Sequence, residues 1–179
     1  MTLAAQTAPP EQPAEAPTSP GRIGFEVAAG TAFEVFPPGG RATQRAVLGA
    51  PALTLRVGSW LEYAVEGHLS RHVTPVTGNV FGIVPFAFRV HTVGRTPVHL
   101  SLGAGQVWTD LAGIRGVEQR RNFITQLGAG IARVRANGSA VSLEARFFHL
   151  SNLRAAPPNL GMEMVSVLVG YAFSKHRIH

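Results

Sequence analysis

Cysteine is absent from the chain, and charged residues are scarce. Without cysteine, the protein can have neither a disulfide framework nor a thiolate metal site. Asp, Glu, Lys and Arg make up 15% of the 179 residues, whereas roughly one quarter is usual in soluble globular domains. No run of 18 or more apolar residues occurs, so no transmembrane helix is expected. The length itself suits a single domain.

Ala, Pro, Gln and Thr dominate the beginning of the chain. This composition predicts a disordered or linker-like segment over residues 1–21, followed by the folded domain over residues 22–179. The segment lacks a basic stretch followed by a long apolar core, so it is not a complete signal peptide. Residues 3–6 (LAAQ) fit the remnant of such a peptide, if translation starts upstream of Met1.

A helical period is almost absent after Arg22, and strand-like alternation recurs instead. Leu53, Leu55 and Val57, for example, alternate with Thr54 and Arg56. Since side chains alternate between the two faces of a strand, such a segment has one apolar face and one polar face. The same pattern predicts eight strands, over residues 23–35, 46–57, 60–71, 80–91, 98–108, 122–135, 140–151 and 163–173.

The connections between these strands alternate in length. Three are short: Gly58-Ser59, residues 94–97, and Asn137-Gly138, which predicts a type I′ hairpin turn. The other four are longer and cover residues 36–45, 72–79, 109–121 and 152–162. Short turns at one end and long loops at the other are typical of outer-membrane barrels.

The predicted fold is therefore all-β, an eight-stranded antiparallel up-and-down outer-membrane β-barrel with a disordered N-terminal segment. A soluble lipocalin-like barrel, whose apolar faces point inward, is the alternative. Several faces opposite the apolar ones combine Glu, Arg and His with Gly and Ser, which favours a narrow polar lumen. We therefore expect charged side chains to fill the interior and to leave no continuous water channel. These side chains are Glu62, Glu66, Arg89, Glu144 and Arg146.

Three polar residues occupy the apolar faces of the last two strands. His149 and Ser151 continue the face of Phe147, and Glu163 shares the face of Val165. A polar group in apolar surroundings is costly without a partner, so we expect the three to partner one another outside the barrel. Hydroxyl, imidazole and carboxylate are the parts of a nucleophilic hydrolase. A hydrogen-bonded cluster that closes a loop explains the same trio equally well.

The remaining candidates concern charge, metals and aromatic rings. The net charge is +6 and nearly all of the positive charge is arginine, which admits nucleic acid, anionic lipid or a phosphorylated glycolipid as partner. Four histidines fit a polar lumen network better than a metal site, namely His68, His72, His91 and His99. Aromatic girdles at a membrane interface account for Trp60, Trp108, Tyr63 and Tyr171. Loop arginines suited to phosphate, or simply solvated, are Arg41, Arg45, Arg115, Arg120, Arg121 and Arg154.

Residues 148–152 (FHLSN), residues 158–161 (PNLG) and Glu163 together resemble the PagL-type lipid A 3-O-deacylases. Residues 122–123 (NF) and 126–130 (QLGAG) are also similar to that family. The resemblance implies an outer-membrane esterase that removes the 3-O-linked acyl chain of lipid A. It also implies the cell outer membrane as the location, lipid A or lipopolysaccharide as the substrate, and no nucleic-acid partner.

The resemblance also implies a role for each site residue. Ser151 would be the nucleophile, His149 the general base, and Glu163 the group that orients His149. Asn159 would help to stabilise the oxyanion, and Asn152 would support the site. No metal or other cofactor is required. A non-enzymatic structural or adhesive barrel and a soluble lipid carrier remain as alternatives, and an oligomer is left open.

Overall fold

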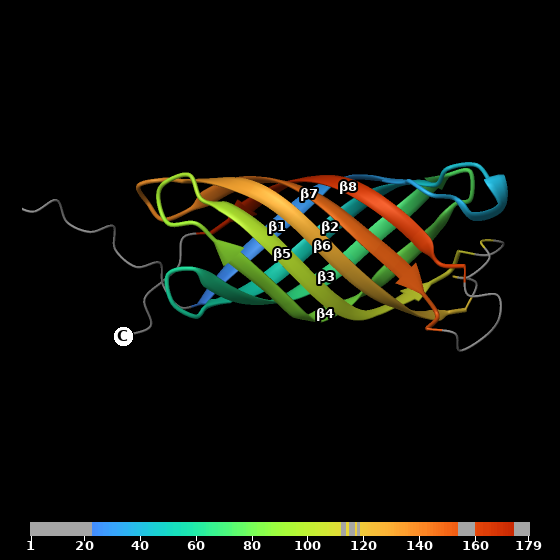
Figure 1. The fold of residues 1–179 in the computed structure, drawn as a ribbon, viewed down its shortest axis with the longest axis horizontal. Coiled ribbons are helices and arrows are strands. Elements are labelled where there is room, and N and C mark those ends of the chain that lie inside the picture. Colours follow the sequence, from blue (N-terminus) through green and yellow to red (C-terminus); the bar gives the residue numbers. More distant parts are fainter. Residues whose placement is uncertain (1–22, 112–113, 115–116, 118, 154–159, 174–179) are drawn as a thin grey trace, which may run out of the picture.

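The computed structural model describes residues 23–111, 114, 117, 119–153 and 160–173. Its strands form one closed antiparallel barrel in which each strand pairs with the next and the last pairs with the first (Figure 1). The predicted disordered segment lies outside the described residues. The strands are β1 (Ile23–Glu34), β2 (Arg45–Arg56), β3 (Leu61–Thr74), β4 (Gly78–His91), β5 (Val98–Thr109), β6 (Arg121–Val134), β7 (Ala140–Ser151) and β8 (Met162–Ala172).

The predicted fold and all eight strands are confirmed, with ends that differ by at most three residues. The largest difference is between β3 and β4, where the long connection predicted over residues 72–79 is wrong. The ladder continues through the pairs Arg71–Asn79 and His72–Gly78, so only residues 75–77 connect the two strands. Backbone pairing thus extends the sheet beyond the alternating segments on which the prediction was based.

The turn at Asn137-Gly138 also differs from the expected type. A type I′ turn needs positive φ at both central residues, and only Gly138 has it, with φ 80°. Gly138 N donates to the Arg135 carbonyl at 3.0 Å, and Arg135 N donates to the Ser139 carbonyl at 2.8 Å. This is the longer hairpin in which a glycine in the left-handed region follows a tight turn.

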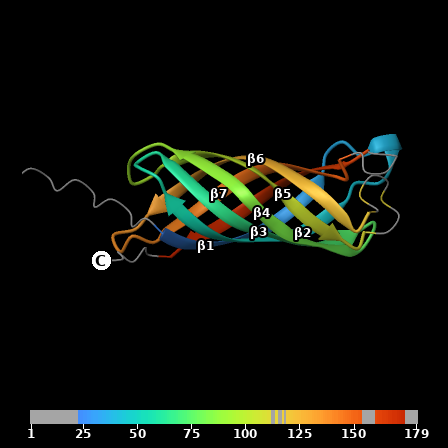
Figure 2. The ribbon, with the colours of Figure 1, turned by 90° about the horizontal axis from the view of Figure 1, so that it is seen from below.

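The barrel has two unlike ends, seen at the left and right of Figures 1 and 2. The turn end carries the three hairpins over residues 57–60, 92–97 and 135–139. The loop end carries the other four connections, including the 3₁₀ turn Pro38–Gly40. Because β7 runs from the turn end to the loop end, its last residues lie at the loop rim.

Charged side chains fill the lumen, as the alternation predicted. Arg146 of β7 reaches Glu66 of β3 at 2.5 Å and Glu144 at 3.1 Å. Arg89 of β4 pairs with Glu62 at 3.4 Å and with Glu26 of β1. The Arg146–Glu66 and Arg89–Glu26 pairs join strands that are not neighbours in the barrel. The carboxylates and guanidinium groups satisfy one another away from water.

The exterior is apolar between the two ends. Many apolar side chains that alternate with the lumen residues are 38–63% exposed, so the apolar faces point outward and the lipocalin-like alternative is not the arrangement found. No helix in the described part of the chain is long and apolar enough to span a bilayer. Exposed members of this outer surface include Phe25, Leu53, Leu69, Phe81, Phe86, Phe88, Leu100, Leu102, Leu127, Leu143, Phe147, Val167 and Val169.

Candidate active site

His149 of β7 and Glu163 of β8 are register partners at the loop end of the barrel. His149 Nδ1 lies 3.7 Å from Glu163 Oε1, and each side chain is 33% exposed. Both belong to the outward face, since Phe147 and Val165 form the next outward pair along the same two strands. The distance is slightly longer than a hydrogen bond, and a small rotation of either side chain would bring the two atoms within bonding range.

Ser151 is the last residue of β7 and lies two positions beyond His149, on the same face. It pairs with Phe123 of β6 and is only 5% exposed. Asn152, the next residue, is also buried. Ser151, His149 and Glu163 therefore share one outward face at the ends of two neighbouring strands. Asn159 lies outside the described residues.

Gly161 packs directly against the His149 imidazole. Its φ is 67°, in the left-handed region that favours glycine. A Cβ at this position would overlap the Cε1 atom of His149 and would lie 3.1 Å from Nε2. Sequence reasoning missed this residue as part of the site, although its place within the PNLG run two residues before Glu163 was a usable signal.

Arg41 links the first loop to the same corner. Its Nη2 donates to the Gly161 carbonyl at 3.5 Å and also pairs with Glu34 at the end of β1. Glu34 Oε2 accepts the backbone N–H of Gln44 at 3.2 Å. The segment before Glu163 is therefore tied to β1 and to the connection that follows it, which helps to fix the backbone beside His149.

The other polar candidates lie elsewhere. Arg45, Arg120 and Arg121 are exposed, and Arg121 donates to Gln106 Oε1 at 3.1 Å. Arg115 and Arg154 lie outside the described residues. The loop arginines therefore do not form one cluster with the site in the part of the chain that the structure describes.

The four histidines considered for a metal fall into separate parts of the barrel interior. His91 and His99 lie side by side with ring centroids 5.5 Å apart. His91 lies 3.7 Å from Glu62, and His99 lies 3.6 Å from Glu144. Among the described residues no group of three or more His, Cys, Asp or Glu is arranged to hold a metal ion.

An imidazole beside a carboxylate, with a hydroxyl two residues away on the same face, can activate that hydroxyl as a nucleophile. The part of this arrangement that is accessible from outside the barrel is the His149–Glu163 pair, since each of these side chains is 33% exposed. An apolar ester lying against β7 and β8 would meet these groups from outside.

Comparison with known proteins bears on this site. The model of the family described as "Lipid A 3-O-deacylase (PagL)" matches residues 42–172. A search of curated proteins finds no match. Several solved structures resemble the barrel, including the following three.

The first is titled "Crystal structure of the outer membrane enzyme PagL", with a TM-score of 0.58 and 18% identity over 82% of this chain and 97% of that one. The second is Neisserial surface protein A (NspA), with a TM-score of 0.56 and 12% identity over 85% and 95% of the two chains. The third is the N-terminal β-barrel domain of Pseudomonas aeruginosa OprF, with a TM-score of 0.51 and 14% identity over 86% and 98%.

At these identities the structural likeness shows the fold, whereas the family match spans the strands that carry His149, Ser151 and Glu163. The chain therefore belongs to the PagL family of lipid A 3-O-deacylases, and it is a β-barrel protein of the bacterial outer membrane.

Proposed function

We propose that this barrel is a serine esterase that hydrolyses the 3-O-linked acyl chain of lipid A. Ser151 is the nucleophile, His149 the general base and Glu163 the residue that orients His149. The observation that carries the proposal is the outward register pair of His149 and Glu163 with Ser151 on the same face. Membership of the family supplies the substrate class.

The reaction proceeds in two halves. His149 accepts the Ser151 hydroxyl proton while Oγ bonds to the ester carbonyl carbon. The tetrahedral intermediate then collapses, its C–O bond to the sugar breaks, and His149 returns the proton to the departing sugar oxygen. Water attacks the acyl-enzyme with His149 again as base, and the fatty acid leaves as Ser151 regains its proton.

Three other groups assist. Glu163 holds the Nδ1–H tautomer of His149 and stabilises the imidazolium that forms. Asn159 donates a hydrogen bond to the oxyanion, and the buried Asn152 supports the turn that follows Ser151. The reaction needs no metal or cofactor.

The exterior position suits the substrate. Acyl chains of an outer-leaflet lipid lie beside the barrel, and the filled lumen leaves them no route through the interior. The short turns of outer-membrane barrels face the periplasm and the long loops face outward. The loop end, and with it Ser151, therefore lies at the outer leaflet, where lipopolysaccharide resides.

Mass spectrometry of lipid A from cells that express the protein tests the proposal. The wild type should remove one ester-linked acyl chain, and Ser151→Ala should remove none while the barrel still folds. Ser142→Ala, near the opposite end of the same strand, is the matched control and should retain activity. Wild-type rates in Ser151→Ala would eliminate Ser151 as nucleophile.

A non-enzymatic structural or adhesive role is the second candidate. NspA and the OprF domain match this barrel nearly as well as the PagL structure does, so the fold alone does not select catalysis. Unchanged lipid A in cells that carry the folded wild-type protein would favour this second candidate.

A further inference from the structure

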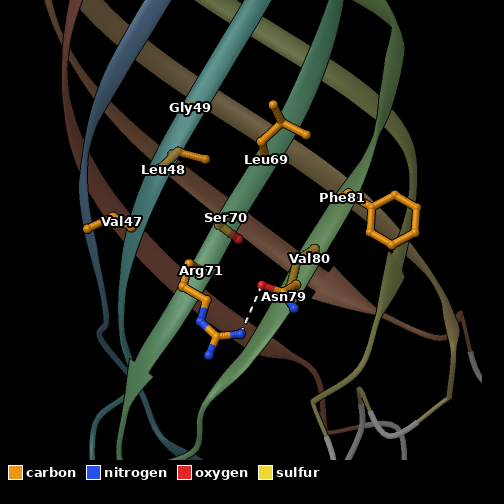
Figure 3. A pocket seen from close by; sticks show the side chains of 9 residues that line it. All are labelled: Val47, Leu48, Gly49, Leu69, Ser70, Arg71, Asn79, Val80 and Phe81. Carbon is orange, nitrogen blue, oxygen red and sulfur yellow. Dashed lines mark hydrogen bonds between the residues drawn. The ribbon is translucent and has the colours of Figure 1, made fainter.

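A shallow apolar groove of about 510 Å³ runs along the exterior of β2, β3 and β4 (Figure 3). Its outward lining includes Val47, Gly49, Leu69 and Phe81. In the closed strand order, β3 is three strands away from β8. The groove is therefore separate from the site that contains Glu163.

Gly49 creates the hollow. It is the register partner of Leu69, and a Cβ at position 49 would meet Leu69 Cβ at 3.9 Å, an ordinary contact. A larger side chain is thus compatible with the backbone here and would fill the groove. Phe81 forms one side of the groove and is stacked on Trp108 of β5, with ring centroids 5.9 Å apart. Gly49 leaves a space between apolar side chains, and such a space suits a hydrocarbon chain.

Arg71 lies at the loop-end limit of the groove, on the same outward face as Leu69. Its Nη1 donates to Asn79 Oδ1 at 3.0 Å, the contact drawn in Figure 3. Asn79 Nδ2 donates to Asp110 Oδ2 at 2.9 Å, and the Asn79 backbone N–H also donates to that carboxylate. Asp110 thereby sets the orientation of the Asn79 amide, whose oxygen faces Arg71.

Asp110, the carboxylate at the end of this series of hydrogen bonds, stays ionised. The Asn79 backbone N–H, followed by the Asn79 amide, holds the pKa of Asp110 below its usual value, so the group stays ionised and keeps accepting both bonds. Arg71 is positioned in this way while using one of its N–H donors. The remaining donors are available, since the side chain is exposed.

A second guanidinium group lies nearby. Arg45 is exposed on the outward face of β2, two residues from Val47, and Val47 is the register partner of Arg71. Arg71 thus lines the groove, and Arg45 lies just beyond it on the adjacent strand. Both are at the end of the barrel that is expected to face the outer leaflet. Guanidinium groups bind phosphate through paired N–H donors.

We propose that this groove is a second lipid A site, with an acyl chain against Gly49 and Leu69 and a phosphate at Arg71. Arg45 adds positive charge at the same rim. The occupant is lipid A rather than a phospholipid because the loop end lies in the lipopolysaccharide leaflet. This site goes beyond the proposed esterase function and does not depend on it, because none of its residues touches His149 or Ser151 in the part of the chain described.

Photo-crosslinking tests the assignment. Full-length protein with Ser151→Ala, which keeps the substrate uncleaved, is placed in phosphatidylcholine nanodiscs that contain lipid A with a diazirine on one acyl chain. Peptide mass spectrometry then locates the labelled residues. Labels should concentrate on residues 45–81, in addition to any on β7 and β8. Dephosphorylated lipid A and diazirine-labelled phosphatidylglycerol form two further arms.

Two variants and two matched controls give the expected pattern. Arg71→Gln and Gly49→Leu should each lower labelling of residues 45–81 by about ten-fold, the loss expected for one charge-assisted hydrogen bond or its equivalent. Arg133→Gln, an exposed arginine at the turn end, and Ala129→Leu, an exposed position on β6, should leave it unchanged. Dephosphorylated lipid A should label the groove as weakly as Arg71→Gln does.

Three results would overturn the proposal. The first is equal labelling of the wild type and Arg71→Gln, and the second is uniform labelling around the barrel. The third is labelling by phosphatidylglycerol as strong as by lipid A, which would show a general anionic-lipid site. Loss of esterase activity has no bearing on these outcomes, so failure of the proposed function and failure of this site are distinguishable.

Discussion

Gly161 and the imidazole of His149 are packed so closely that no other residue fits at position 161 without displacing the ring. The contact crosses from the segment before β8 to β7. It combines a close approach with a φ of 67°, so both sterics and backbone conformation require glycine. In the proposed mechanism, this packing limits where the His149 ring can lie.

Gly161→Ala should therefore lower kcat by about ten- to a hundred-fold, as expected when a catalytic group is misplaced by roughly an ångström. KM should change little, because position 161 is proposed to act through His149. Deacylation of lipid A in detergent micelles measures both constants.

Gly138→Ala is the matched control for Gly161→Ala. Gly138 also has a positive φ, of 80°, but a Cβ there would meet nothing within 4 Å. It should lose a similar amount of backbone stability and keep its activity. Equal rates in the two variants would show that the packing against His149 has no part in catalysis.

Glu163→Gln should reduce kcat by about a hundred-fold or more, because the amide no longer stabilises the imidazolium and permits the wrong tautomer. Glu163→Ala should be less severe than Ser151→Ala or His149→Ala, since the third member of such a triad usually contributes least. Rates for all four variants, measured on purified folded barrels, give the ranking. A Glu163 variant with wild-type kcat would remove this residue from the mechanism.

Arg146→Met should destabilise the barrel by about 3–5 kcal/mol, the typical cost of removing one partner from a buried ion pair. Arg146 is 2% exposed and contacts both Glu66 and Glu144. Urea unfolding in lipid vesicles measures the difference. Arg133→Met, on the exterior near the turn end, should stay within about 0.5 kcal/mol of the wild type. An equally small effect for Arg146→Met would contradict the view that its ion pairs hold the lumen together.

The protein should not conduct ions as a porin does. Arg146 spans from β7 to Glu66 on β3, Gln126 of β6 reaches the same carboxylate at 2.9 Å, and Arg89 spans from β4 to Glu26 on β1. These contacts cross the interior from several walls, which an eight-stranded barrel is just wide enough to allow. Planar-bilayer recordings should show no porin-like steps, and steps of that size would disprove a filled lumen.

Much of this structure was predictable from side-chain alternation, for a physical reason. A strand cannot turn one residue without turning all of them, so the polarity of Glu144 and Arg146 fixed the outward direction of His149 and Ser151. The same rule located Glu163. Register then followed from the short hairpin between β6 and β7 and from closure of the barrel.

Contacts made by backbone were not predictable in the same way. The pairing of Arg71 with Asn79 depends on the ladder continuing through polar residues, which no alternation reveals. The packing of Gly161 on His149 depends on where a loop returns, and the arginine link through Arg41 joins two loops far apart in sequence. The type of the turn at Asn137 was predicted from the Asn-Gly dipeptide alone. The turn type also depends on where the backbone pairing of β6 and β7 ends.

The proposed position of Ser151 on the outer wall of the barrel has a kinetic meaning. An active site on the wall of a closed barrel meets its substrate by lateral diffusion within one leaflet, so the relevant concentration is a surface density. Diluting lipid A with inert lipid would slow such an enzyme even at a constant total amount. Crowding, domain formation and packing order among neighbouring lipids would then be determinants of turnover, alongside the chemistry proposed for Ser151 and His149.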